Sequence, residues 1–301
     1  MLQKKNIVIL VLVALVLGGV ALFFSAQLNR NGTQHTAHSG EASSQPVDQS
    51  HRSYRIDLAS RNNPLQARQP STLTYTIKND RGDVVKNFEV THEKIMHFIV
   101  VRKDLQHFLH LHPVFNQNTG EFSTDITFPA NGLYRLFPDF TPHDENPQKL
   151  PVTVSTDVTV GDTDENLPMI VDSQPRKSVD GYQITSTLPK ELEKQKEVKY
   201  RLTIEKNDQP VKDLEPYLGA LGHSVILKKD TLDFIHTHAL EEKTSNEGHG
   251  QGHGETQQSQ TAGPHIDFAT LFPDAGTYKV FTQFQHQGKI ITTDYVVRVN
   301  E

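Results

Sequence analysis

The sequence predicts an all-β protein in which two tandem β-sandwich domains follow an N-terminal transmembrane helix. Three observations lead to this prediction. The chain has one long apolar segment near its N-terminus, a succession of short alternating segments separated by turn residues, and an internal duplication.

The apolar segment covers residues 7–25, reads IVILVLVALVLGGVALFFS and follows Lys4 and Lys5. About 20 apolar residues in a helix span the bilayer core, and the preceding lysines favour a cytoplasmic N-terminus. The alternative is a cleaved signal peptide, which requires small residues in an A-x-A-like pattern, whereas Phe24 occupies the best candidate site. We therefore predict an uncleaved transmembrane signal anchor at residues 1–26. The protein would cross the cell membrane once and hold its C-terminal body in the extracytoplasmic space.

The composition excludes several classes of site. The chain has no Cys, so disulfides, thiolate zinc sites, iron–sulfur clusters and blue-copper centres are excluded. It has only three Met, which disfavours a Met-rich Cu(I) site, and it shows no basic stripe of the kind that binds nucleic acid. Histidine is abundant, with 16 residues, several of them in tight groups.

Short strand patterns begin near residue 54 and continue to residue 160. They read YRIDLA, LTYTIKN, FIVVR, FLHLH, FSTDITF, YRLF and VTVSTDVTV, and turn signals such as NDRG and ANG separate them. Several short strands with regular turns are typical of an all-β sandwich, and we find no convincing helical period before residue 161.

The duplication is clearest where residues 97–112 (HFIVVRKDLQHFLHLH) align without gaps on residues 223–238 (HSVILKKDTLDFIHTH). The later motif FPANGLY in the first copy aligns on FPDAGTY in the second. The chain therefore divides as follows: a disordered stalk at residues 27–52, a first sandwich (repeat 1) at 53–161, a linker at 162–179 and a second sandwich (repeat 2) at 180–301. An insertion rich in His and Gly at residues 240–263 is expected to be disordered.

Each repeat contains a His…His-x-His cluster. In a strand, His110 and His112 point to the same face. A hairpin centred between Asp104 and Leu105 places His97 opposite His112 and diagonal to His110, at separations from which imidazoles can converge on one ion.

The same register in repeat 2 brings together His223, His236 and His238. His265 follows the insertion and is the candidate fourth ligand of that site, with Glu121 as its counterpart in repeat 1. Taken individually, four other histidines are expected to be structural or solvated: His92, His107, His143 and His286.

Imidazole ligands without thiolates suit Zn(II), Cu(II) or Ni(II), so the expected metal is Cu(II) or Zn(II). Binding should weaken as the pH falls through about 6–6.5, because histidine must be neutral to bind a metal. The alternative interpretation is that stacked neutral histidines fill one edge of each sandwich.

Two stretches resemble a known group of proteins: GALGHSVILKKDTLDFIHTHA from Gly219, and GPHIDFATLFPDAGTYKVFTQFQHQGKIITTDYVVRV from Gly263. They are similar to uncharacterised bacterial secreted or membrane-anchored proteins with tandem YtkA-like, copper-resistance-associated immunoglobulin-like domains. The resemblance implies immunoglobulin-like sandwiches and the handling of copper or another heavy metal outside the membrane. It extends to the three histidines of each cluster.

The favoured hypothesis is a non-enzymatic, membrane-anchored protein that captures, buffers or delivers copper or zinc. Its partners would be the metal ion and a membrane metal transporter or another membrane protein. One alternative is a structural or protein-interaction module without metal. Another is a zinc hydrolase with Glu93 or Asp139 as base, which is disfavoured because the second copy has Gly219 and Gln283 at these positions.

Overall fold

A computed structural model describes residues 53–60, 64–143, 149–163, 168, 174–240 and 262–301. These residues belong to one compact unit, Glu41–Glu301, and all of their regular elements are β-strands, which confirms the all-β prediction. No helix long and apolar enough to cross a membrane occurs in this part of the chain. The predicted anchor and stalk, most of the insertion and part of the linker lie outside the described residues.

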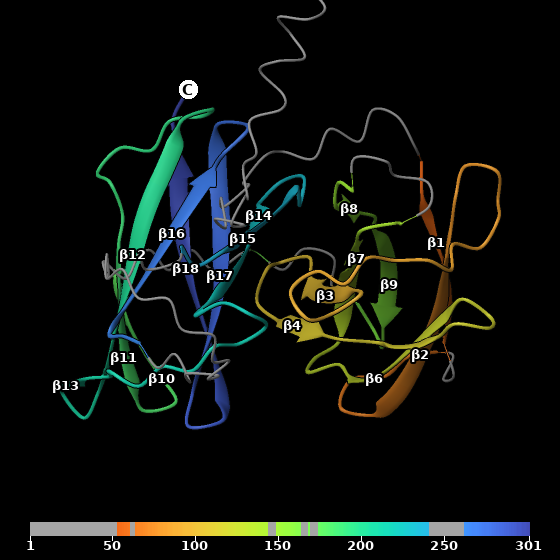
Figure 1. Ribbon diagram of the computed structural model, residues 1–301, viewed down its shortest axis with the longest axis horizontal. Helices are drawn as coiled ribbons and strands as arrows, with labels where there is room; N and C mark the ends of the chain where they lie inside the picture. Colours follow the sequence, from red (N-terminus) through yellow and green to blue (C-terminus); the bar gives the residue numbers. More distant parts are fainter. Residues whose placement is uncertain (1–52, 61–63, 144–148, 164–167, 169–173, 241–261) are drawn as a thin grey trace, which may run out of the picture. The chain divides into compact units, whose positions relative to one another are not determined.

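Repeat 1 consists of two antiparallel sheets (Figure 1). The first has the order β1-β2-β6-β5: β1 Arg55–Ser60, β2 Pro70–Lys78, β6 Glu121–Thr127 and β5 Val114–Asn116. The second has the order β4-β3-β7-β8, with β9 also paired to β7: β4 Phe108–Leu111, β3 His97–Arg102, β7 Gly132–Phe140, β8 Val152–Thr153 and β9 Thr156–Val160.

Repeat 2 has the corresponding pair of sheets. The first has the order β10-β11-β12-β13, with β16 paired to β12: β10 Arg176–Val179, β11 Tyr182–Thr187, β12 Glu197–Lys206, β13 Gln209–Pro210 and β16 His265–Leu271. The second has the order β15-β14-β17-β18: β15 Phe234–His238, β14 His223–Lys228, β17 Gly276–His286 and β18 Lys289–Val299.

Each repeat encloses its own apolar core between its two sheets. In repeat 1, Tyr75 from the first sheet stacks on Phe98 from the second, with ring centroids 4.8 Å apart. In repeat 2, Tyr200 and Phe268 stack within the first sheet, and the second sheet covers them with residues such as Phe284. Alternation along the strands directs these side chains inward, as expected for a β-sandwich.

The repeated FP-x-x-G-x-Y motif forms the same local structure in both copies. The Tyr134 hydroxyl donates to the carbonyl of Ala130 at 2.8 Å, and the Tyr278 hydroxyl donates to the carbonyl of Asp274 at 2.8 Å. Both tyrosine rings also contact the preceding Phe of the motif at a centroid distance of 4.9 Å. The motif therefore fixes the start of β7 and of β17, the strands next to β3 and β14.

Strands β3 and β14 are buried on both faces, which explains their continuous apolar runs. One face belongs to the core of the same repeat, and the other lies in a third apolar cluster to which both repeats contribute. Its contacts are reciprocal: Phe108 stacks on Phe281, and Phe234 stacks on Phe137. Phe108 aligns with Phe234 and Phe137 aligns with Phe281, so the two pairs are equivalent. The contact between the repeats therefore has the two-fold character of a symmetric dimer interface.

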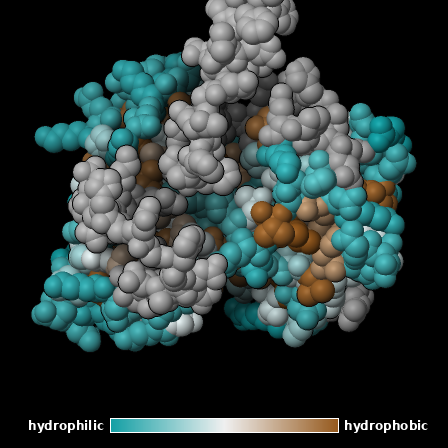
Figure 2. Space-filling model, in the orientation of Figure 1, coloured by the Kyte–Doolittle hydropathy of each residue, from teal (hydrophilic) through white to brown (hydrophobic). Residues whose placement is uncertain are grey.

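The face shown in Figure 2 is mostly hydrophilic where its residues are described, with one hydrophobic patch on the right-hand side of the view. The exposed large hydrophobic residues of the described chain are Val90, Val114, Leu150 and Ile290. Isolated apolar residues of this kind are normal for a soluble domain and do not indicate a docking surface.

Candidate metal centre

The hairpin register predicted from the sequence is confirmed in both repeats. In repeat 1, Ile99 pairs with His110 and Phe98 with Leu111, the register that sets His97 opposite His112. In repeat 2, His223 pairs directly with His238. The three histidines of each hairpin therefore lie on one face, and that face belongs to the side of the sheet where the two repeats meet.

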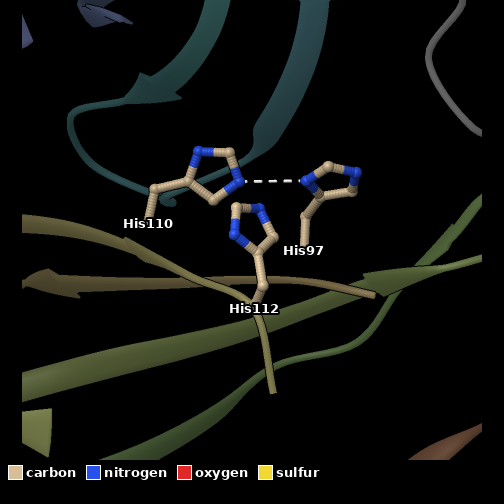
Figure 3. A group of neighbouring side chains, drawn as sticks. All are labelled: His97, His110 and His112. Carbon is tan, nitrogen blue, oxygen red and sulfur yellow. Dashed lines mark hydrogen bonds between the residues drawn. The ribbon is translucent and has the colours of Figure 1, made fainter. Parts of the chain in front are cut away.

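The first triad consists of His97, His110 and His112. Each of these residues offers one potential ligand nitrogen, and the three nitrogens lie within 4.8 Å of one another. Figure 3 shows the three rings pointing toward a common centre, with His97 Nδ1 and His110 Nε2 separated by 3.0 Å. His112 Nε2 is buried and has no hydrogen-bond partner among the described residues.

The second triad consists of His223, His236 and His238, whose ligand nitrogens also lie within 4.8 Å of one another. Here His223 Nδ1, His236 Nε2 and His238 Nε2 are all buried and lack a hydrogen-bond partner within the described part of the chain. Buried polar atoms are rarely left unsatisfied in proteins, so three together require an explanation such as a bound ion or water.

Backbone carbonyls fix the tautomer of the first histidine in each triad. His97 Nε2 lies 3.2 Å from the carbonyl oxygen of Thr91, and His223 Nε2 lies 2.7 Å from that of Tyr217. A carbonyl oxygen can only accept, so each Nε2 carries the proton and each Nδ1 presents a lone pair. Metal-binding histidines typically hold their other nitrogen in this way.

The second histidine of each triad is oriented by the opposite repeat. His110 Nδ1 donates to Gln283 Oε1 at 2.7 Å, and Gln283 is held in this orientation because its Nε2 donates to Thr292 at 3.0 Å. His236 Nδ1 lies 2.9 Å from Asp139 Oδ2. Asp139 and Gln283 are aligned residues, so each repeat supplies the same position to orient a histidine of the other repeat. In both His110 and His236, Nε2 is left with its lone pair facing the triad.

This arrangement fits a cation better than a histidine–histidine hydrogen bond. His97 Nδ1 and His110 Nε2 both present lone pairs, yet they lie only 3.0 Å apart. Such a contact is repulsive unless a proton or a cation lies between them. Two nitrogens bound at about 2.0–2.1 Å to a tetrahedral ion are roughly 3.3 Å apart, close to the spacing found here.

Burial disfavours a proton, compared with a metal ion, between these two nitrogens. Desolvation, reinforced by neighbouring imidazoles, lowers the pKa of His97 to about 4 and the pKa of His112 to about 3. Desolvation likewise lowers the pKa of His223 to about 3 and holds the pKa of His236 well below its ordinary value. At neutral pH these rings are therefore neutral, which is the form that binds a metal.

The two triads differ in their surroundings. His92 stacks on His238 with ring centroids 3.6 Å apart, whereas the residue aligned with His92 in repeat 2 is Leu218. The first triad instead opens onto a cavity of about 470 Å³. The cavity is lined by residues of both repeats, including His110, His112, Glu93, Lys94, Tyr217 and Leu218.

His265 does not join the second triad. It lies at the start of β16 in the other sheet of repeat 2, is exposed, and contacts Thr203 Oγ1 at 3.1 Å. Its counterpart Glu121 is also exposed, at the start of β6. Its place after the insertion predicted a fourth ligand from the next strand, but pairing of that strand with β12 takes His265 to a different sheet.

Among the other histidines, His286 agrees with the structural interpretation, and His92 lies beside the triads. His286 is buried between the Tyr182 hydroxyl at 2.8 Å and Asp213 at 3.0 Å. His92 lies among the triad histidines, with ring contacts to His97, His223 and His238. No spacing signal distinguishes His92, because its position in repeat 2 is a leucine.

Sequence reasoning also missed the roles of Asp139 and Gln283. Both are polar residues at aligned positions in β7 and β17, where Asp139 pairs with His97 and Gln283 pairs with His223. Nothing local in the sequence shows that each would also bond to a histidine of the other repeat. That contact exists only because the β4-β3-β7 and β15-β14-β17 sheets pack together.

Comparison with solved structures finds several chains of low similarity. An Escherichia coli adhesin, FdeC, is 14% identical over 82% of this chain and 64% of its own, with a TM-score of 0.25. Salmonella alpha-2-macroglobulin is 9% identical over 81% of this chain and 15% of its own, with a TM-score of 0.23. Domains 4 and 5 of the S-layer protein SbsC are 11% identical over 82% and 98%, with a TM-score of 0.20.

These TM-scores are too low to support an inference about function, and the chain spans less than two thirds of the adhesin and of the macroglobulin. No curated protein matches the sequence. A family model described as "Domain of unknown function (DUF8832)" matches residues 48–158 and 177–301, which coincide with the two repeats. Because these matches cover more than half of the chain, the protein belongs to the DUF8832 family.

Proposed function

We propose that this protein is a non-enzymatic binder of a divalent metal, copper or zinc, held by the two histidine triads. In this proposal the chain is anchored in the cell membrane by residues 1–26, and two immunoglobulin-like sandwiches present the triads outside the cytoplasm. It would capture, buffer or deliver the metal, with a membrane metal transporter or another membrane protein as partner.

One observation carries the proposal: in each triad, buried imidazole nitrogens with lone pairs converge without a hydrogen-bond donor among the described residues. In the second triad all three nitrogens lack a partner among the described residues, and in the first triad two lone pairs meet at 3.0 Å. Imidazole nitrogens without thiolates favour Zn(II) and Cu(II) over Ca(II) or Mg(II).

The proposal is tested by metal titration of the full chain in detergent at pH 7.5. We expect about two equivalents of Zn(II) or Cu(II), measured by calorimetry and by elemental analysis after gel filtration. Replacing His97, His110 and His112 together by Gln should remove one equivalent, and the same change in the second triad should remove the other. Absence of stoichiometric binding by the unmodified chain would end the proposal.

His265→Gln is the matched control. It removes an imidazole from repeat 2, which contains the second triad, but from an exposed position in the sheet that does not hold the triad. The full two equivalents should remain. Loss of an equivalent in this variant would show that the exposed histidines, and not the triads, hold the metal.

A structural module without metal is the second candidate, and the burial of the triads between the repeats favours it. Under that hypothesis the rings act as packing, and His92 stacked on His238 would be one such contact. The titration separates the two functions, because a packing role predicts that Gln variants lower stability while the unmodified protein binds no metal.

A further inference from the structure

The two triads adjoin one another across the contact between the repeats. The ring centroids of His97 and His236 are 5.4 Å apart, and those of His110 and His236 are 6.3 Å apart. His97 also lies 6.5 Å from His223. These separations resemble those within a single triad, such as 5.2 Å between His97 and His112, so the six rings form one continuous cluster.

The cluster is tied together by bonds that cross between the repeats. Each triad takes its ligands from one repeat, but its second histidine is held by a side chain of the other: His110 by Gln283 and His236 by Asp139. Outer partners of this kind fix the ring orientation and the tautomer of a ligand. An ion bound in either triad would therefore favour the packed arrangement of the two repeats.

The two outer partners are not equivalent, although they occupy aligned positions. Asp139 is a carboxylate, 7% exposed, and it also accepts from the Thr153 hydroxyl at 3.1 Å. Gln283 is a neutral amide, 8% exposed, that donates to Thr292. A carboxylate makes the imidazole to which it is bonded a more basic ligand, whereas an amide oxygen does so much less.

The two triads also differ in access, and the first is the more accessible. The first triad opens onto the cavity lined by His110 and His112, with the charged side chains of Glu93 and Lys94 at its wall. At the corresponding place on the second triad, the ring of His92 lies flat against His238. A site with an open face exchanges its ion and accepts an incoming ligand, whereas a closed site retains its ion.

We infer that the two triads form one two-ion centre shared by the repeats, in which the second triad holds a resident ion and the first exchanges its ion through the cavity. This inference rests on the proposed function. Repulsion between two divalent ions so close together weakens the second binding step further, which again favours exchange at the more weakly binding triad. Asp139 is the positioning residue that makes the second triad the tighter site.

The test is a competition titration of the full chain in detergent with Zn(II) and a chelator, repeated on the two triple Gln variants, each of which retains one triad. We expect two binding steps in the unmodified chain. The variant that keeps the second triad should show the tighter constant, and Co(II) absorption spectra should identify which triad is filled at one equivalent.

Asp139→Asn should lower the affinity of the second triad by about 10–100-fold and that of the first by less, because His236, of the second triad, is the triad histidine that bonds to this carboxylate. Gln283→Glu should raise the metal affinity of the first triad. The double variant, Asp139→Asn with Gln283→Glu, should bring the affinities of the two triads closer together. Asp125→Asn is the matched control: it changes a carboxylate bonded to Thr72 in the other sheet and should leave both constants unchanged.

A purely structural role for Asp139 would instead lower both constants together, along with the thermal stability of the metal-free chain. That result would overturn the inference, as would equal constants for the two triads in the triple variants. In both cases the proposed function would stand, since metal would still bind. Failure of the unmodified chain to bind any metal would remove the proposed function itself.

Discussion

The two histidine triads have the same register and different surroundings. In each, a hairpin presents three imidazoles, and a backbone carbonyl fixes the tautomer of the first. The second triad has a carboxylate behind His236 and a ring stacked on His238. The first has an amide behind His110 and a cavity at its face.

The difference shows that the two copies share the three histidines while the surroundings of these histidines differ. The three histidines lie within one hairpin and are set by strand alternation, so they are repeated wherever the hairpin is repeated. The surroundings come from β7, β17 and the loops of the opposite repeat, and each of these can change without disturbing the hairpin. Four changes would break or sharpen this comparison.

The largest expected effect comes from the aromatic pairs that join the repeats. Phe281→Ala and Phe137→Ala should each cost about 3–5 kcal/mol of unfolding free energy, because each side chain is 3% exposed and stacks on a Phe of the other repeat. Urea denaturation of the metal-free chain measures the loss. The exposed Val114→Ala should change stability by less than about 0.5 kcal/mol. A loss below about 1 kcal/mol for both Phe variants would show that the repeats do not depend on this contact.

Acidification should have an intermediate effect on the metal-free chain. Burial lowers the pKa of His97 to about 4 and that of His223 to about 3, whereas an unfolded histidine titrates near 6.5. Between these values the unfolded chain binds more protons, so stability is highest above about pH 6.5 and falls as the pH is lowered toward 4. Urea midpoints measured from pH 7.5 to 4 report this slope.

The same titration assigns the slope to the triads. Removing either triad with three Gln substitutions should flatten the slope, because burial lowers the pKa of histidines in both triads. His265→Gln, an exposed change, should leave the slope as it is. A flat stability profile for the unmodified chain would contradict the burial of the imidazoles.

A smaller effect is expected just before each triad, where the repeats have Met96 and Gly222. A Cβ on Gly222 would lie 2.9 Å from the Phe268 ring and 3.2 Å from the backbone oxygen of Gln283, so Gly222→Ala should cost about 1–3 kcal/mol through overpacking. Met96→Leu, which conserves volume, should cost less than about 1.5 kcal/mol even though it removes the acceptor of the Tyr75 hydroxyl. Thermal denaturation compares the two. Equal losses would show that the close contact at Gly222 relaxes.

The smallest effect on stability is expected from exchanging the residues beside the triads. His92 and Leu218 are aligned and both have a positive φ, 51° and 54°, so repeat 2 already has a leucine in this backbone conformation. It should change unfolding free energy by less than about 1 kcal/mol while speeding release of the ion from the second triad several-fold. Stopped-flow mixing with a chelator measures the release rate. Unchanged release would show that the stacked ring does not close the site.

Much of the fold could be predicted from the sequence, because the signals are local. The predicted strands of repeat 1, the duplication and both hairpin registers agree with the structure. The position of His265 could not be predicted correctly, since it depends on the pairing of β16 with β12. Thr203, which His265 contacts, lies 62 residues earlier in the chain. His92 was missed because one His in an irregular loop carries no periodic signal.

By itself, the sequence determined that three imidazoles gather on one hairpin face in each repeat, since period-two alternation and the turn position fix which residues are opposed. Only the tertiary structure decided that the two faces adjoin, that Asp139 and Gln283 orient histidines of the opposite repeat, and that one triad is open and the other covered. The physical reason is that these contacts form between surfaces brought together by burial of the shared apolar cluster. The hydrophobic effect is non-directional, so the sequence pattern does not specify which residues burial brings into contact.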